Sequence, residues 1–245
     1  MKISGSIKLA VDYLLREGVF YMDKKLAIIH TTHVTIEPLK NLASEFIPEV
    51  KVINFLDDSI LPQLIENGGD IAEVRDRWFT YAKIAESLGA DVILSACSSV
   101  GELADELNGK LSVPVLRIDE AMIERAVALG NVIGVAATLS TTLRPTINLV
   151  KAKAEKACKA IKVEPVLVDE AYKLLMQGDG EGHDKVLAQK LNELAQRVDV
   201  VVLAQASMAR VLDRLHENIK DKFLTSPRLG MMKVRDVLRG IRRHE

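Results

Sequence analysis

Asp91-Val92-Ile93-Leu94-Ser95-Ala96-Cys97-Ser98-Ser99-Val100-Gly101-Glu102 is the stretch that decides how the rest of the chain is interpreted. Its apolar run ends at a cysteine and two serines, and a helical pattern follows. Such a run predicts a buried parallel strand that leads into the N-terminus of a helix. Backbone N–H groups at a helix N-terminus favour negative charge, so we expect the Cys97 thiol to ionise more readily than a free thiol.

A second stretch, residues 199–208, repeats this pattern with Gln205 in place of the cysteine. Other pairs recur in the same order along the chain: Thr31 with Thr138, Pro38 with Pro145, and Gly69 with Gly180. This repeat, together with alternating strand and helix patterns, predicts an α/β fold of two similar three-layer halves, each with a mostly parallel sheet. We expect a pseudo-dyad to relate the halves and a cleft to lie between them.

The expected boundaries follow from the same repeat. Residues 23–117 and 216–245 are expected to form the first α/β domain, and residues 118–215 the second. Residues 1–22 precede the regular alternation and carry apolar side chains at helical spacing, so they are expected to form an N-terminal helical extension.

The composition excludes several classes of function. A net charge of −1 and an aromatic content of 4% argue against a nucleic-acid partner or an anionic membrane surface. The two cysteines are too few for a disulfide framework, so a cytoplasmic location is expected. The histidines lack metal-ligand spacing, and no glycine-rich phosphate motif follows a strand, so neither a metal nor another cofactor is expected.

Four polar clusters end predicted strands, at residues 30–35, 97–99, 138–142 and 205–207. Ligands of open parallel sheets bind beyond the carboxyl ends of strands, so these clusters are expected to meet in the cleft. We predict Cys97 and Gln205 as the catalytic pair that flanks the ligand. The residues predicted to bind substrate are Thr31, Thr32, His33, Ser98, Ser99, Thr138, Ser140, Thr141 and Ser207. Helix capping for the serines and threonines, and core packing for the cysteine, are the structural alternatives.

These residues give the chain a resemblance to the aspartate/glutamate/hydantoin racemase superfamily, from Lys24 onward. The resemblance rests on the repeat and on residues 95–99, 134–138 and 203–208. It implies cofactor-independent chemistry at a carbon next to a carboxylate or carbonyl group. In the racemases one cysteine removes a proton from one face of this carbon and a second cysteine returns one to the other face. Cys97 takes the first of these positions and Gln205 the second.

Gln205 departs from the racemase pattern, because an amide cannot take or give a proton at a useful pH. Cys97 could act alone, as in the related arylmalonate decarboxylases, although these keep the cysteine of the other half. His33 or a bound water could supply the second proton, or Cys97 could add to a double bond as in the related maleate isomerases.

The expected function is therefore an isomerase acting on a small carboxylic acid, with a lyase as the second choice. A non-catalytic carboxylate binder, and a protein whose residues 1–20 bind a partner, remain as alternatives, and a homo-oligomer is expected by default.

Overall fold

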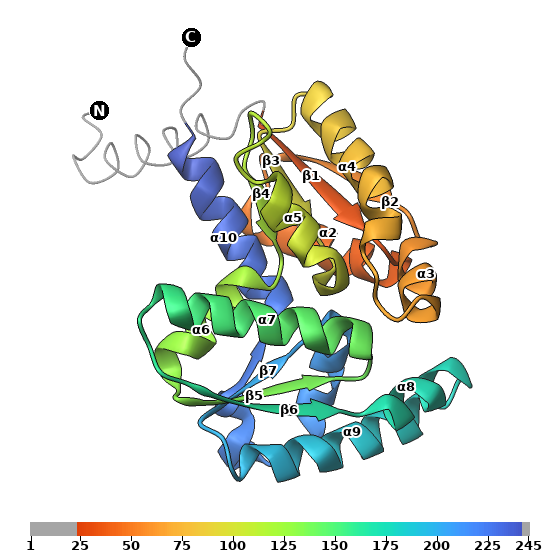
Figure 1. The fold of residues 1–245 in the computed structure, drawn as a ribbon, viewed down its shortest axis with the longest axis vertical. Helices are drawn as coiled ribbons and strands as arrows, with labels where there is room; N and C mark the ends of the chain where they lie inside the picture. Colours follow the sequence, from red (N-terminus) through yellow and green to blue (C-terminus); the bar gives the residue numbers. More distant parts are fainter. Residues whose placement is uncertain (1–23, 242–245) are drawn as a thin grey trace, which may run out of the picture.

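The structure is a computed structural model that describes residues 24–241. The expected N-terminal extension lies outside these residues. Within them, two four-stranded sheets lie one above the other, each with all its strands parallel (Figure 1). The first sheet has the order β2-β1-β3-β4, with β1 at Lys25–His30, β2 at Lys51–Leu56, β3 at Val92–Ser95 and β4 at Val115–Arg117. The second has the order β6-β5-β7-β8, with β5 at Val132–Ala137, β6 at Lys162–Leu167, β7 at Val200–Leu203 and β8 at Phe223–Thr225. The shared strand order confirms the two similar halves.

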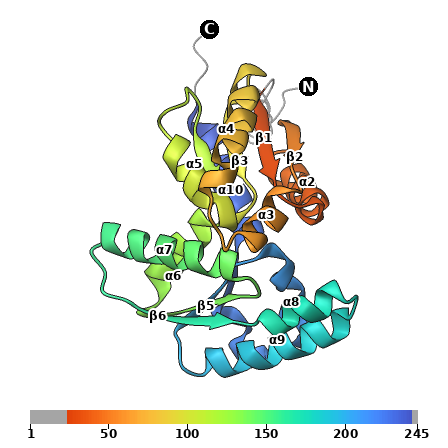
Figure 2. The same cartoon turned by 45° about the vertical axis from the view of Figure 1, so that its right-hand side comes forward.

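Helices cover both faces of each sheet (Figures 1 and 2). In the first half, α2 (Ile36–Phe46) and α10 (Ser226–Gly240) pack on one face, and α3 (Ile60–Glu66), α4 (Ala72–Ser87) and α5 (Gly101–Leu107) pack on the other. In the second half, α6 (Glu120–Leu129) and α7 (Ser140–Lys156) cover one face, and α8 (Asp169–Met176) and α9 (Gly180–Ala195) the other. The central strands β3 and β7 are buried throughout, which explains their continuous apolar runs.

The chain crosses to the second half between β4 and α6, next to the boundary expected at residue 117. It returns later than the expected residue 216. Strand β8 pairs with β7 through Leu203 and Thr225, so residues up to Thr225 belong to the second sheet. The return comes with α10, whose Met231, Val234 and Leu238 join the core of the first half. A strand of only three residues is too short to produce a recognisable period in the sequence.

Three turns that follow strands are 3-10 helices: η1 (His33–Thr35), η2 (Ser98–Val100) and η3 (Ala206–Arg214). The sequence predicts regular helices after Cys97 and Gln205, but the chain is wound more tightly there. Helix α7 begins at Ser140, so Pro145 lies in its second turn rather than in the first turn as expected. Because proline has no N–H group, the carbonyl of Thr141 loses its intrahelical partner. Among residues 24–241, no helix combines the length and apolar composition needed to cross a membrane.

Candidate active site

Cys97 lies at the carboxyl edge of the first sheet. In the pairing of β1 with β3, Ile29 is opposite Ser95. Thr31 and Cys97 each come two residues later, so they occupy matching positions beyond the ends of neighbouring strands. Cys97 has extended backbone at the start of η2 and is partly exposed, whereas Ser98 and Ser99 are buried. The first hydrogen bond of the turn runs from Val100 N–H to the Cys97 carbonyl at 3.4 Å. The turn therefore starts at Cys97, as predicted. The N–H groups of its first residues come before Val100 in the sequence, so they take no part in this bond.

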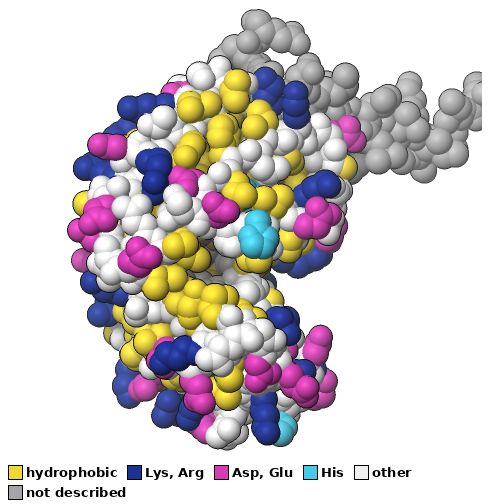
Figure 3. Space-filling view, turned by 90° about the vertical axis from the view of Figure 1, so that its right-hand side faces the viewer, with side chains coloured by type: hydrophobic (Ala, Val, Ile, Leu, Met, Phe, Trp, Pro, Cys, Tyr) yellow, Lys and Arg dark blue, Asp and Glu magenta, His cyan; other side chains and the backbone are white. Residues whose placement is uncertain are grey.

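The two halves meet directly behind this turn. Ser99 Oγ lies 3.0 Å from Thr142 Oγ1 in a buried hydroxyl pair between η2 and α7. Glu102 extends the contact by accepting a hydrogen bond of 3.1 Å from Asn148 Nδ2. These contacts bring the carboxyl edges of the two sheets together, as the repeat predicts. Figure 3 shows the surface hollowed between the halves, with hydrophobic side chains on both sides of the hollow.

Gln205 is held by Thr138, the residue that follows β5. The backbone N–H and the Oγ1 hydroxyl of Thr138 both donate to Gln205 Oε1, at 2.6 and 3.0 Å. A backbone N–H can only donate, so the atom that faces it must be the carbonyl oxygen of the amide. The Nε2 group is therefore turned away from Thr138. Gln205 thus presents two N–H donors and no proton-transfer group.

Thr31 and Thr141 carry buried hydroxyl groups without a protein partner. Thr31 is 1% exposed and Thr141 is 7% exposed, and neither Oγ1 has a hydrogen bond within residues 24–241. Buried polar atoms are paired in most native structures, so an unpaired hydroxyl needs an explanation. One of these threonines follows β1 in the first half, and the other lies in the first turn of α7 in the second half. Both belong to the predicted binding set, and a bound ligand would satisfy them.

The remaining predicted residues differ in exposure. Thr32 is partly exposed, whereas His33, Ser140 and Ser207 are exposed. The Ser98 side chain is buried in the Cys97 turn. The described residues contain no group of three or more His, Cys, Asp and Glu side chains that could hold a metal ion.

His30 supports the cluster that follows β1. It is fully buried, with Nε2 donating to Asn54 Oδ1 at 2.9 Å and Nδ1 lying 2.7 Å from Thr35 Oγ1. These bonds tie the end of β1 to β2 and to η1, and so hold the loop that carries Thr31. Burial lowers the pKa of the His30 imidazole below its ordinary value, while the hydrogen bond to Asn54 acts in the opposite direction.

Acidification is therefore expected to destabilise the protein through His30. Below a pH of about 6.5 the unfolded chain binds a proton at this residue that the folded chain still excludes. The free energy of unfolding should fall as the pH drops from this value toward the lowered pKa of the folded state. Urea unfolding of the wild type and of His30→Gln at pH 7 and pH 5.5 measures this effect. The variant should lose less stability than the wild type over this interval, and equal losses would contradict the assignment.

A second polar network anchors η3, the turn that follows Gln205. Asp184 on α9 is buried and accepts hydrogen bonds from Arg210 Nε and Nη2 at 3.2 and 2.9 Å, with His183 Nδ1 at 2.7 Å on its other oxygen. Burial alone would raise the pKa of Asp184, but the bonds from His183 and Arg210 outweigh burial and lower it. The carboxylate is therefore charged at neutral pH and ties η3 to α9.

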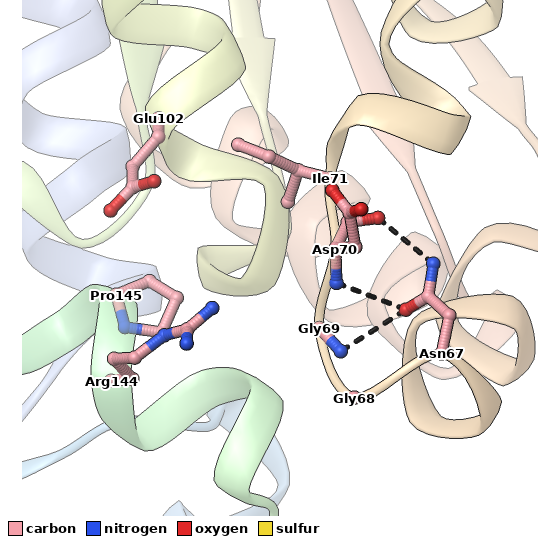
Figure 4. A pocket seen from close by; sticks show the side chains of 8 residues that line it. All are labelled: Asn67, Gly68, Gly69, Asp70, Ile71, Glu102, Arg144 and Pro145. Carbon is pink, nitrogen blue, oxygen red and sulfur yellow. Dashed lines mark hydrogen bonds between the residues drawn. The ribbon is translucent and has the colours of Figure 1, made fainter.

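A cavity of about 290 Å³ lies beside the site, between the halves. Its wall consists of Asn67, Gly68, Gly69, Asp70, Ile71, Glu102, Arg144 and Pro145 (Figure 4). None of the predicted catalytic or binding residues lines it. It nevertheless adjoins the predicted cluster, because a Cβ atom on Gly69 would lie 3.7 Å from Thr141 Cγ2. We therefore place the candidate site at the strand ends and treat this cavity as its neighbour.

The contacts of several residues around the site have no signal in the sequence. Thr142 lies in the predicted polar cluster 138–142, but nothing in the sequence indicates its contact with Ser99 across the halves, and Arg117 packs under the Cys97 turn without any such cluster around it. Arg117 occurs in a short apolar segment that predicts a strand but gives no indication of a role for the arginine. The pairing of Gly69 with Gly180 in the repeat does mark the loop that lines the cavity, although it does not indicate what the loop contacts.

The fold defines a class of protein: two similar α/β halves, each with a four-stranded parallel sheet, which contact each other through the turns that follow their strands. Residues 28–234 match the family model described as Asp/Glu/Hydantoin racemase, and the chain belongs to this family. None of the curated proteins matches its sequence.

Solved structures with the same fold are distant in sequence. Glutamate racemase RacE1 from Bacillus anthracis is 13% identical with a TM-score of 0.70, and the match covers 90% of this chain and 83% of that one. An aspartate racemase homologue from Pyrococcus horikoshii is 15% identical with a TM-score of 0.65, covering 88% and 99%. Allantoin racemase from Pseudomonas fluorescens is 16% identical with a TM-score of 0.56, covering 88% and 91%. At these identities the structures establish the fold.

Proposed function

We propose that this protein is a cofactor-independent isomerase of the racemase type, which moves a proton at the carbon next to the carboxylate of a small acid. The observation that carries the proposal is the pair of buried, unpartnered hydroxyls of Thr31 and Thr141, one from each half. A carboxylate accepts hydrogen bonds through both oxygens, so it would satisfy both groups. The N–H groups of the first turn of α7 add to this preference for an anion.

Cys97 is the proposed acid/base group. It lies beside Thr31 at the sheet edge and is partly exposed, with its side chain packed against the core of the first half. Removing a proton next to a carboxylate produces an enediolate, whose negative charge must be stabilised at the carboxylate oxygens. The hydroxyls of Thr31 and Thr141 would provide this stabilisation, and donors of this kind contribute about 2.7–4 kcal/mol each in enzymes.

Gln205 would act as a hydrogen-bond donor on the opposite side. Thr138 holds its Oε1, which leaves Nε2 to face the ligand. Because the amide cannot transfer a proton, Cys97 would serve one face only, and inversion would take the proton for the opposite face from a bound water or from His33. This asymmetry favours a lyase as the second candidate: loss of carbon dioxide from a substituted malonate also produces an enediolate, and that intermediate needs one proton from one side.

Proton NMR in D₂O tests the proposal over a panel of 2-hydroxy, 2-amino and 2-aryl acids and substituted malonates. Exchange of the α-hydrogen with inversion supports the isomerase, and release of carbon dioxide with one-sided deuteration supports the lyase. Exchange on no member of the panel, together with unchanged iodoacetamide labelling of Cys97 in the presence of these acids, would rule out both.

Thr138→Val tests the assigned orientation of Gln205. The substitution keeps the backbone donor at 2.6 Å but removes the hydroxyl donor at 3.0 Å. A net hydrogen bond is worth about 0.5–1.5 kcal/mol, so we expect the rate of exchange to fall by up to about tenfold. Thr146→Val is the matched control, because Thr146 is also a buried threonine and lies on α7, where the one hydrogen bond of its hydroxyl among the described residues is to the Thr142 carbonyl, at 2.8 Å. Equal losses in the two variants would contradict the role of Gln205.

A further inference from the structure

Arg117 is a buried charge at the end of β4 that the chemistry described so far does not use. Its side chain is 3% exposed. Nε and Nη2 donate to the two carboxylate oxygens of Asp119 at 2.9 and 3.0 Å, and Nη1 donates to Asp105 Oδ2 at 2.6 Å. Such a two-pronged pair fixes the plane of the guanidinium as well as its position.

The guanidinium packs directly on the backbone of Gly101. A Cβ atom at this residue would lie 2.4 Å from Arg117 Cζ and Nη2, which is closer than real Cβ contacts allow. Gly101 is the residue at which η2 becomes α5, and its φ of −59° is ordinary for a helix. The glycine is therefore required for space and not for its backbone freedom.

Arg117 adjoins the Cys97 turn in two ways, through the backbone of β4 on one side and through its guanidinium on the other. On the strand side it is paired with Ser95, two residues before Cys97. On the helix side it contacts Gly101 and bonds Asp105, one turn further along α5. The guanidinium cannot retreat from the turn without breaking its bonds to Asp119, which is 0% exposed.

We propose that Arg117 is a positioning residue for Cys97. Its guanidinium fixes the distance between β4 and the turn from Cys97 to Gly101, and this distance determines where the sulfur lies at the mouth of the cleft. The proposal rests on the proposed function, because it takes Cys97 as the reacting group. A residue that only stabilised the fold would change the stability of the protein without a specific change at the sulfur.

The rate of iodoacetamide labelling of Cys97 is the readout, measured at pH 7 in a Cys158→Ser background that removes the other, exposed thiol. Gly101→Ala places a methyl group against the guanidinium, which displaces the turn, and we expect labelling to slow by about tenfold because the sulfur moves from its place at the mouth of the cleft and becomes less accessible to the reagent. Arg117→Lys keeps the charge beside Asp119 but takes the planar group away from Gly101. In the double variant the methyl group then has room, and labelling should return to within about threefold of Arg117→Lys alone.

Met231→Ala is the control for stability, because Met231 is fully buried in the same half and lies on α10, which packs on the opposite face of the sheet from α5. It should lower the unfolding midpoint without slowing the labelling. Equal slowing in Met231→Ala and Gly101→Ala, no slowing in Gly101→Ala, or no recovery in the double variant would each overturn the proposal. If Cys97 in the otherwise unchanged protein reacts like an ordinary free thiol and no carboxylate slows it, the proposed function fails. The coupling between Gly101 and Arg117 can still be tested in that case.

Discussion

Cys97→Ala is expected to lower the rate of α-hydrogen exchange by about 10²- to 10⁴-fold, the usual contribution of a general acid or base. The thiol is the only proton-transfer group among the predicted catalytic residues, because Gln205 carries an amide. Cys97→Ser should be impaired to a similar extent, since a hydroxyl is a much weaker acid than a thiol. The measurement is deuterium incorporation by NMR with the acid on which the wild type acts.

The second cysteine supplies the matched control for this experiment. Cys158 is exposed near the end of α7 and has a φ of 52°, so it lies in the left-handed region. Cys158→Ser should retain the full rate, because this position is distant from the strand ends of the site. Undiminished exchange in both Cys97 variants would show that the cysteine does not carry the chemistry.

Arg117→Met is expected to cost about 3–5 kcal/mol of folding free energy, because it leaves the charge of a buried partner uncompensated. Asp119 is 0% exposed, and the only ion pair that it makes among the described residues is with Arg117. Burial disfavours the charged guanidinium, but Asp119 and Asp105 outweigh burial and raise the pKa of Arg117 above its ordinary value. The guanidinium of Arg117 is thus charged at pH 7, the pH of the unfolding experiment.

Urea unfolding at pH 7 measures this loss, with the slope of the transition checked for constancy. Arg117→Met/Asp119→Leu removes both charges and should be clearly less destabilised than the single variant, because a buried pair can be replaced by apolar side chains at little net cost. A cost below about 1 kcal/mol for the single variant, or a double variant worse than the single, would contradict the buried-charge account.

Local patterns predict most of the secondary structure and the place of Cys97. The apolar run of β3 and its echo in β7 each end at the edge where the halves meet, and the residues around them carry the family resemblance that the family model confirms. The prediction is less accurate where tertiary pairing decides the outcome. Strand β8 has three residues and joins the second sheet only because β7 offers a free edge. The turns after Cys97 and Gln205 begin as 3-10 helices, of which the first packs against α7 of the other half and the second against α9 of its own half.

The sequence by itself determined that two similar parallel α/β halves are present, that a cysteine ends a buried strand in one, and that an amide stands at the matching place in the other. These features depend on the order and spacing of residues along the chain. Only the tertiary structure decided which way the amide points, because Thr138 is 67 residues from Gln205. Only the tertiary structure paired Ser99 with Thr142 across the halves and placed Arg117 against Gly101, because such contacts depend on how the strands and the halves pack together.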